Sequence, residues 1–187
     1  MYGLQHQALR QTVNLYALQR FNTAEDWYTE MDRETAHHDA NKVSERLYKE
    51  FKPESVIDLG CGIGLFLQSF ENQGCTVTGI EGSRSAIKHS VVVDIQYADL
   101  RNVYEPDKQY DLVICFEVAE HIPEKHSDSL VESIVNSGDI VAFTAATPGQ
   151  GGTYHVNEQP RNYWINKFND RGFVYENKIT ELIISDL

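Results

Sequence analysis

The sequence is poor in long hydrophobic runs, in cysteine and in basic residues, and each shortage excludes a class of protein. No stretch of about 18 apolar residues occurs, so we expect no membrane-spanning helix. Residues 1–10 are polar and lack the apolar block of a signal peptide. The three cysteines show no metal-ligand spacing, which favours reduced thiols and a cytoplasmic protein.

The shortage of basic residues bears on the partners of the protein. Sixteen lysine and arginine residues stand against 28 aspartate and glutamate residues, which gives a net charge of −12. A surface of this sign repels phosphate backbones unless a basic patch compensates, and no tight basic cluster occurs in the sequence. We therefore expect a small-molecule partner in place of a nucleic acid.

The chain has enough apolar residues for one domain with an N-terminal extension. Apolar residues make up 41% of the 187 positions. They recur at roughly helical spacing across residues 4–21 and again across residues 41–51, before Pro53 ends the helix. We interpret residues 1–52 as an N-terminal helical extension or lid and residues 53–187 as the main domain.

After Pro53, short apolar runs alternate with helical patterns. Strands are expected at residues 55–59, 76–81, 91–98, 110–116 and 139–145, with a sixth strand starting at 173–175. Mostly continuous apolar strands are typical of a parallel sheet covered on both faces. The predicted fold class is therefore α/β, with a doubly wound, mainly parallel sheet.

A glycine-rich turn follows the first of these strands. Gly60, Gly62 and Gly64 have the spacing G-x-G-x-G, and glycine lets the backbone turn sharply and approach a ligand closely. A dinucleotide-binding turn reads G-x-G-x-x-G, so this turn is one residue shorter. Asp58 precedes it and would repel a pyrophosphate, which disfavours a nicotinamide-dependent oxidoreductase. The turn suits a nucleoside that carries a cationic amino-acid tail.

Two further acids end the next two strands. Glu81 closes the second strand, where a carboxylate can accept hydrogen bonds from both hydroxyls of a ribose. Asp99 follows the third strand and can accept from an exocyclic amine of adenine, while Leu100 offers its backbone N–H to the ring. Because the carboxyl ends of parallel strands meet at one rim, we expect these acids to line one adenosyl-binding site.

The segments VIDLGCGIG, TGIEGS, YADL and YDLVICFEVAEHIPE resemble the successive motifs of class I S-adenosylmethionine-dependent methyltransferases. The resemblance covers roughly residues 55–122. It implies a Rossmann-like methyltransferase fold and S-adenosylmethionine as cofactor, with its methionine, ribose, adenine and methyl parts held in turn by the four strand ends. The cofactor-binding residues so implied are Asp58, Gly60, Cys61, Gly62, Gly64, Glu81, Gly82, Asp99, Leu100, Phe116 and Glu117.

An acid–histidine cluster follows the fourth strand. On a helical turn Glu117, Glu120 and His121 would share a face. Three interpretations fit: support of the cofactor loop, a general base at His121, or a divalent-cation site. The spacing E-x-x-E-H resembles a cation site of some ubiquinone-biosynthesis O-methyltransferases and small-RNA 2′-O-methyltransferases. The histidine-rich signature of the RNA enzymes is not matched, so a metal is not favoured and His121 is predicted as catalytic.

The long polar loop after the fifth strand is expected to face the acceptor. His155 in this loop is the second predicted catalytic base. Tyr154, Tyr163 and Trp164 could form an aromatic wall around an acceptor or a sulfonium, although Trp164 is more typical of a core residue.

The resemblance implies methyl transfer from S-adenosylmethionine to an oxygen or nitrogen of a small-molecule acceptor, with S-adenosylhomocysteine as product. Two alternatives stay open: an RNA methyltransferase with a divalent metal, and a catalytically silent cofactor-binding partner subunit. The family's sheet usually ends in an antiparallel seventh strand. Too few residues follow the sixth strand for this, so the sheet is expected to be shortened at its C-terminus, and a homodimer that covers its edge stays open.

Overall fold

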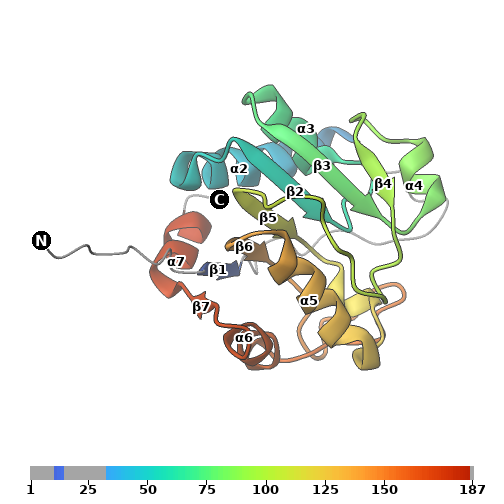
Figure 1. The fold of residues 1–187 in the computed structure, drawn as a ribbon, viewed down its shortest axis with the longest axis vertical. Helices are drawn as coiled ribbons and strands as arrows, with labels where there is room; N and C mark the ends of the chain where they lie inside the picture. Colours follow the sequence, from blue (N-terminus) through green and yellow to red (C-terminus); the bar gives the residue numbers. More distant parts are fainter. Residues whose placement is uncertain (1–10, 15–32, 186–187) are drawn as a thin grey trace, which may run out of the picture.

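Short apolar runs bounded by glycine-rich or polar turns form the strands of a seven-stranded sheet (Figure 1). The computed structural model describes residues 11–14 and 33–185. All the paired strands in the sheet are parallel. Across the sheet the order is β4 (Ile95–Tyr97), β3 (Thr76–Glu81), β2 (Ser55–Leu59), β5 (Leu112–Cys115), β6 (Ile140–Phe143), β1 (Gln11–Asn14) and β7 (Val174–Tyr175). The predicted α/β class with a mainly parallel sheet is confirmed.

The helices cover both faces of the sheet and enclose one apolar core on each (Figure 1). One core contains residues of α2 (Arg33–Phe51), α3 (Leu65–Asn72) and α7 (Asn177–Ser185). The other contains residues of α5 (Ser127–Ser137) and α6 (Arg161–Asn169). Buried side chains alternate between these cores along β5 and β6, as the pleat requires.

Strand β5 illustrates why the strand sequences are apolar throughout. Leu112 and Ile114 pack into the core beneath α3, whereas Val113 and Cys115 pack into the core beneath α5. All four side chains are buried, so the strand has no solvent face. Within the ranges that the structure describes, no helix has both the length and the apolar character needed to cross a membrane.

Several predicted helix boundaries follow from local chemistry. Helix α2 ends at Phe51, two residues before Pro53, as expected. The Ser83 side chain accepts a hydrogen bond from the Ala86 N–H at 3.2 Å and so caps α4 (Arg84–Lys88). Pro160 immediately precedes α6, where its missing N–H costs no helical hydrogen bond.

The prediction of a helix across residues 4–21 is wrong at Gln11–Asn14. This segment forms strand β1, which lies between β6 and β7 and runs parallel to both. The sheet is therefore extended by a strand from the N-terminal segment. The rest of the predicted helix lies outside the described residues.

The C-terminal part of the chain forms a helix that packs on the sheet. After β7, residues 177–185 form α7, which packs against α2 and β1. No described residue beyond β7 forms the antiparallel strand that the family usually has. Strand β1 occupies the position between β6 and β7, in parallel orientation.

Candidate functional site

A cavity of about 550 Å³ opens at the carboxyl ends of β2, β3, β4 and β5. The parallel topology brings these four strand ends to one rim, where ligands of open α/β sheets bind. The cavity is lined by Gly60, Glu81, Gly82, Ser83, Tyr97, Asp99, Leu100, Arg101, Glu117, Val118, His121, Ile122, Pro123, Tyr154 and Val156.

The glycine turn forms the floor of this cavity at the end of β2. Gly60, Gly62 and Gly64 all have positive φ angles, of 87°, 56° and 87°. A Cβ at Gly60 would lie 2.3 Å from a methyl carbon of Val118, so a larger residue does not fit without movement. The sequence therefore needs glycine here for both conformation and space.

Glu81 holds the glycine turn in place. Its carboxylate accepts hydrogen bonds from the Gly62 N–H at 2.8 Å and from the Ser83 N–H at 2.6 Å. Burial raises the pKa of Glu81, and these amide hydrogen bonds oppose that rise. The carboxylate lines the cavity as predicted, and in this structure it is oriented by backbone amides.

Asp58 lies beneath the turn and does not line the cavity. Its side chain is buried, with the residue only 3% exposed. Burial, and then the nearby Glu81 carboxylate, raise the pKa of Asp58. The site therefore carries two neighbouring buried acids, an environment that favours a ligand with a positive charge and hydroxyl donors.

Asp99 lies at the rim and pairs with Arg101. The guanidinium donates to the two carboxylate oxygens, with Nε–Oδ1 at 2.8 Å and Nη2–Oδ2 at 2.6 Å. The hydrogen bond from Arg101 holds the pKa of Asp99 below its ordinary value. Both residues line the cavity, so the predicted adenine-binding acid already has a cationic neighbour.

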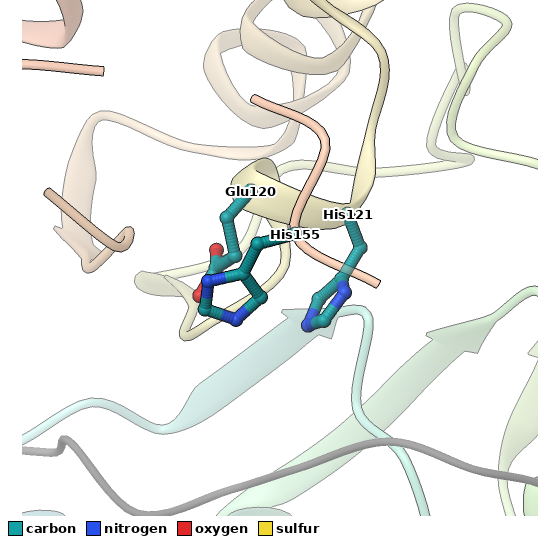
Figure 2. A group of neighbouring side chains, drawn as sticks. All are labelled: Glu120, His121 and His155. Atoms are coloured by element: carbon teal, nitrogen blue, oxygen red, sulfur yellow. The ribbon is translucent and has the colours of Figure 1, made fainter. Parts of the chain in front are cut away.

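The acid–histidine cluster meets the cavity at His121, whereas Glu120 and the predicted base His155 do not line it. One ligand atom each from Glu120, His121 and His155 lie within 4.8 Å of one another. Figure 2 shows the Glu120 carboxylate and the two imidazoles pointing into one space. The imidazole rings meet edge to face with their centroids 5.0 Å apart. Two segments that are far apart in the chain, one carrying Glu120 and His121 and the other His155, thus supply a single cluster.

The Glu120 carboxylate is the most unusual group of the cluster. The residue is fully buried, and both carboxylate oxygens lack a hydrogen-bond partner. Burial, and to a smaller extent the Glu117 carboxylate, raises the pKa of Glu120 to about 8. A buried carboxylate without a donor costs free energy, which a bound proton or a ligand would offset.

The two imidazoles each use one ring nitrogen within the protein. Nδ1 of His121 lies 3.3 Å from the Tyr154 carbonyl oxygen, and its buried Nε2 has no partner. Nδ1 of His155 lies 3.1 Å from a Glu158 carboxylate oxygen. Burial, followed by the neighbouring His155, lowers the pKa of His121. One nitrogen of each ring is therefore left for a ligand.

The backbone around the cluster departs from the helical turn expected at residues 117–121. Glu117 has a positive φ of 54°, and only Ala119–His121 form a short 3₁₀ helix. The Glu117 N–H donates to the Thr144 hydroxyl at 2.9 Å, which anchors this strained residue to the end of β6. Glu117 consequently faces the cavity, while Glu120 is turned inward.

A family described as a methyltransferase domain matches residues 30–138, more than half of the 187-residue chain. The chain belongs to the class I S-adenosylmethionine-dependent methyltransferases.

Individual relatives agree with this assignment. A ubiquinone biosynthesis O-methyltransferase of Coxiella burnetii is 25% identical over 126 residues, covering 61% of this chain and 54% of its own. The enzyme of the same name from Rickettsia typhi is 36% identical over 107 residues, covering 52% and 43%. The chain thus spans about half the length of the curated relatives it matches.

Solved structures show the same fold. An amino pentose methyltransferase from Micromonospora echinaspora, solved with S-adenosylmethionine bound, has a TM-score of 0.55 at 19% identity. The alignment covers 69% of this chain and 60% of that one.

The residues of this methyltransferase fit S-adenosylmethionine. Gly60 presents backbone without a side chain at the cavity surface, and Glu81 presents a carboxylate at the same rim. The two raised carboxyl pKa values are consistent with a site completed by a cationic ligand.

The structure gathers part of the predicted site at the cavity surface. Gly60, Glu81, Gly82, Asp99, Leu100, Glu117 and His121 line it. Five predicted cofactor residues do not line it: Asp58, Cys61, Gly62, Gly64 and Phe116. Phe116 packs edge to face on Phe66, with ring centroids 5.1 Å apart, and the Cys61 thiol is buried. That these five residues contribute to cofactor binding from beneath the cavity surface stays a prediction.

Trp164 and Tyr163 form no wall of this cavity. Trp164 is buried in the core with Phe143, as its pattern favoured, and Tyr163 packs on it. Of the three predicted aromatic residues, Tyr154 alone lines the cavity, with 70% of its surface exposed.

Several lining residues were not anticipated from the sequence. Tyr97, Arg101 and Pro123 each lie within two residues of a predicted site residue or strand end, so proximity was an available signal. Val156 directly follows the predicted base His155 and had the same signal. Its backbone N–H donates to the Glu120 carbonyl at 2.8 Å, a contact between distant segments that sequence spacing does not reveal.

Proposed function

We propose that this methyltransferase transfers a methyl group to a hydroxyl oxygen of a small apolar acceptor, assisted by a divalent cation held by Glu120, His121 and His155. The sequence alone did not favour a metal. The observation that carries the proposal is the buried Glu120 carboxylate, whose two oxygens have no hydrogen-bond partner beside two available imidazole nitrogens. One carboxylate and two imidazoles are a common donor set for first-row divalent metals.

The acceptor region supports an apolar substrate. Val118, Ile122, Pro123, Tyr154 and Val156 surround the cavity near the cluster. Arg101 is the only lysine or arginine lining the cavity in the described part of the chain, and it pairs with Asp99. The relatives named as O-methyltransferases favour oxygen over nitrogen as the accepting atom.

The residues have separate tasks in the transfer. The glycine turn and Glu81 would hold the donor, and the apolar rim would exclude water from the acceptor. A bound cation lowers the pKa of an acceptor hydroxyl. The acceptor oxygen then forms a bond to the methyl carbon as the sulfur–carbon bond breaks, and the hydroxyl proton leaves to solvent, with S-adenosylhomocysteine as the second product.

A turnover assay with a panel of phenols and catechols tests this proposal. We expect activity to be lost in chelator, restored by Mn²⁺ or Zn²⁺, and reduced at least about 100-fold in Glu120→Gln. Binding of S-adenosylhomocysteine, measured by calorimetry, should persist in this variant. The matched control is Glu124→Gln, because Glu124 is an exposed acid on the neighbouring segment.

Other outcomes would point elsewhere. Full activity in chelator, lost when His121 or His155 is replaced by alanine, would make that histidine a general base without metal. Cofactor binding without turnover of any acceptor would instead support the silent partner subunit.

A further inference from the structure

Glu158 organises the loop that carries His155. One carboxylate oxygen accepts the Gly149 N–H at 2.8 Å. The other accepts the Gly151 N–H at 2.7 Å and lies 3.1 Å from Nδ1 of His155. A single side chain therefore joins the glycine-rich segment to an imidazole of the cluster.

The contact with Glu158 bears on which nitrogen of His155 carries the proton. An ionised carboxylate only accepts hydrogen bonds, so the neutral imidazole facing it must carry its proton on Nδ1. Nε2 is then left with a lone pair. Carboxylates that orient imidazole ligands in this way also raise their basicity.

Gly152 couples the same loop to the ring by close packing. A Cβ at Gly152 would lie 2.3 Å from Nε2 of His155 and 2.4 Å from Cε1. The imidazole is only 8% exposed and has little freedom to rotate away. Hydrogen bonds on one side of the ring and the loop backbone on the other thus define its orientation.

We propose that Glu158 is a positioning residue that sets the Nδ1–H tautomer of His155 and thereby makes Nε2 available to the cluster of Glu120, His121 and His155. The proposal deepens the proposed function and rests on it for the identity of the ligand. The tautomer itself does not depend on a metal, so the two ideas can be tested separately.

A purely structural role for Glu158 makes a different prediction. If the carboxylate only holds the loop, Glu158→Gln or Glu158→Ala changes loop stability and leaves the ring tautomer as it was. If Glu158 positions His155, the tautomer shifts toward Nε2–H, the form in which Nε2 cannot bind a cation.

Nitrogen-15 NMR of the imidazoles tests the first part without metal. Spectra are recorded at pH 8, where an ordinary imidazole is neutral, and His155 is assigned by loss of its signals in His155→Gln. We expect Nδ1–H for His155 in the native protein, a shift to Nε2–H in Glu158→Ala and a smaller shift in Glu158→Gln. The matched control, Glu124→Ala, should not alter the spectrum. Nε2–H in the native protein would overturn the proposal.

Cation binding tests the second part. Calorimetry with Mn²⁺ or Zn²⁺ should show affinity falling about 10- to 100-fold in Glu158→Ala, with binding of S-adenosylhomocysteine retained. Should Glu158→Ala fail to fold, Glu158→Gln carries the same comparison. Unchanged tautomer and unchanged affinity in a folded variant would contradict a positioning role. Absence of cation binding to the native protein would contradict the proposed function, while the NMR result still decides the role of Glu158.

Discussion

Gly60 is the residue on which the floor of the cofactor cavity most directly depends. Its φ of 87° is unfavourable for any side chain, and Val118 occupies the space next to its α-carbon. Gly74 has a similar φ of 92°, but nothing lies within 4 Å of the position a Cβ would take. Comparing substitutions at Gly60 and Gly74 therefore distinguishes the cost of backbone strain from the cost of steric overlap.

Gly60→Ala is expected to destabilise the protein by about 3 kcal/mol, the sum of left-handed strain and overpacking. Gly74→Ala should lose about 1 kcal/mol, from strain alone. Only the former should weaken binding of S-adenosylhomocysteine, by at least about tenfold, because Val118 lines the cavity. Urea unfolding and calorimetry measure the two effects. If both variants lost the same free energy of unfolding, the Val118 side chain would be able to move aside without destabilising the protein.

Asp58 and Glu81 are two neighbouring buried acids, and their proximity affects the pH dependence of stability. Burial and mutual repulsion raise the pKa of Asp58, so the folded protein holds the Asp58 proton more tightly than the unfolded chain does. Stability from this group is fully present below the ordinary carboxyl pKa of about 4 and is lost as the pH rises through the folded-state value. The ligand-free protein should therefore lose stability at this site toward neutral pH.

Asp58→Asn removes that titration. The free energy of unfolding of the variant, relative to the native protein, should increase between pH 4.5 and pH 8 in the absence of cofactor. Binding of S-adenosylmethionine should weaken in the same variant, because one negative charge is lost from the site. Denaturant unfolding at the two pH values gives the comparison. A difference that is constant with pH would show that Asp58 ionises equally in both states.

Strand β1 is the element that sequence reasoning did not find. Gln11–Asn14 contains one apolar residue, and its neighbours have apolar residues at roughly helical spacing. Its conformation is set by pairing with β6 and β7, which lie more than a hundred residues away in the chain. Local propensity does not contain this information. The continuous apolar strands β2, β3, β5 and β6 were predictable because burial on both faces leaves a composition signal.

Segment 117–121 shows the same limit within the site. The acids and the histidine were identified from their residue types. The expected helical turn was wrong at Glu117, whose backbone conformation depends on the Thr144 hydroxyl at the end of another strand. Its carboxylate still lies close enough to Glu120 to raise the pKa of that group. Likewise, the spacing after β6 does not show that His155 meets Glu120, because that contact follows from hydrogen bonds between the two loops.

Thr12→Pro tests the placement of β1. Thr12 pairs with Val141 on one side and with Tyr175 on the other, so proline removes an N–H from a strand with neighbours on both sides. We expect a loss of about 1–3 kcal/mol in the free energy of unfolding. The control Thr12→Val keeps a β-branched residue and should have little effect. Urea unfolding measures both; a stable proline variant would show that β1 contributes little to the sheet.

At the scale of the whole molecule, the two cores and the ligand site share one sheet. The strands that carry the glycine turn and Glu81 also supply buried side chains to both cores. A ligand that binds only the folded state should therefore stabilise the entire domain. The predicted homodimer and the division at residue 52 stay predictions at this scale.

Thermal unfolding with S-adenosylhomocysteine measures that coupling. At a concentration 100 times its dissociation constant, a ligand adds about 2.7 kcal/mol, which for a domain of this size corresponds to about 5–10 °C. NAD at the same concentration should produce no shift, because its pyrophosphate would lie beside Asp58 and Glu81, two buried acids with little compensating positive charge. In Glu81→Gln the shift should become smaller, because Glu81 is predicted to accept hydrogen bonds from the ribose. A shift with NAD and none with S-adenosylhomocysteine would contradict this account of the cavity, since the short glycine turn and its acids would then be accommodating a phosphate.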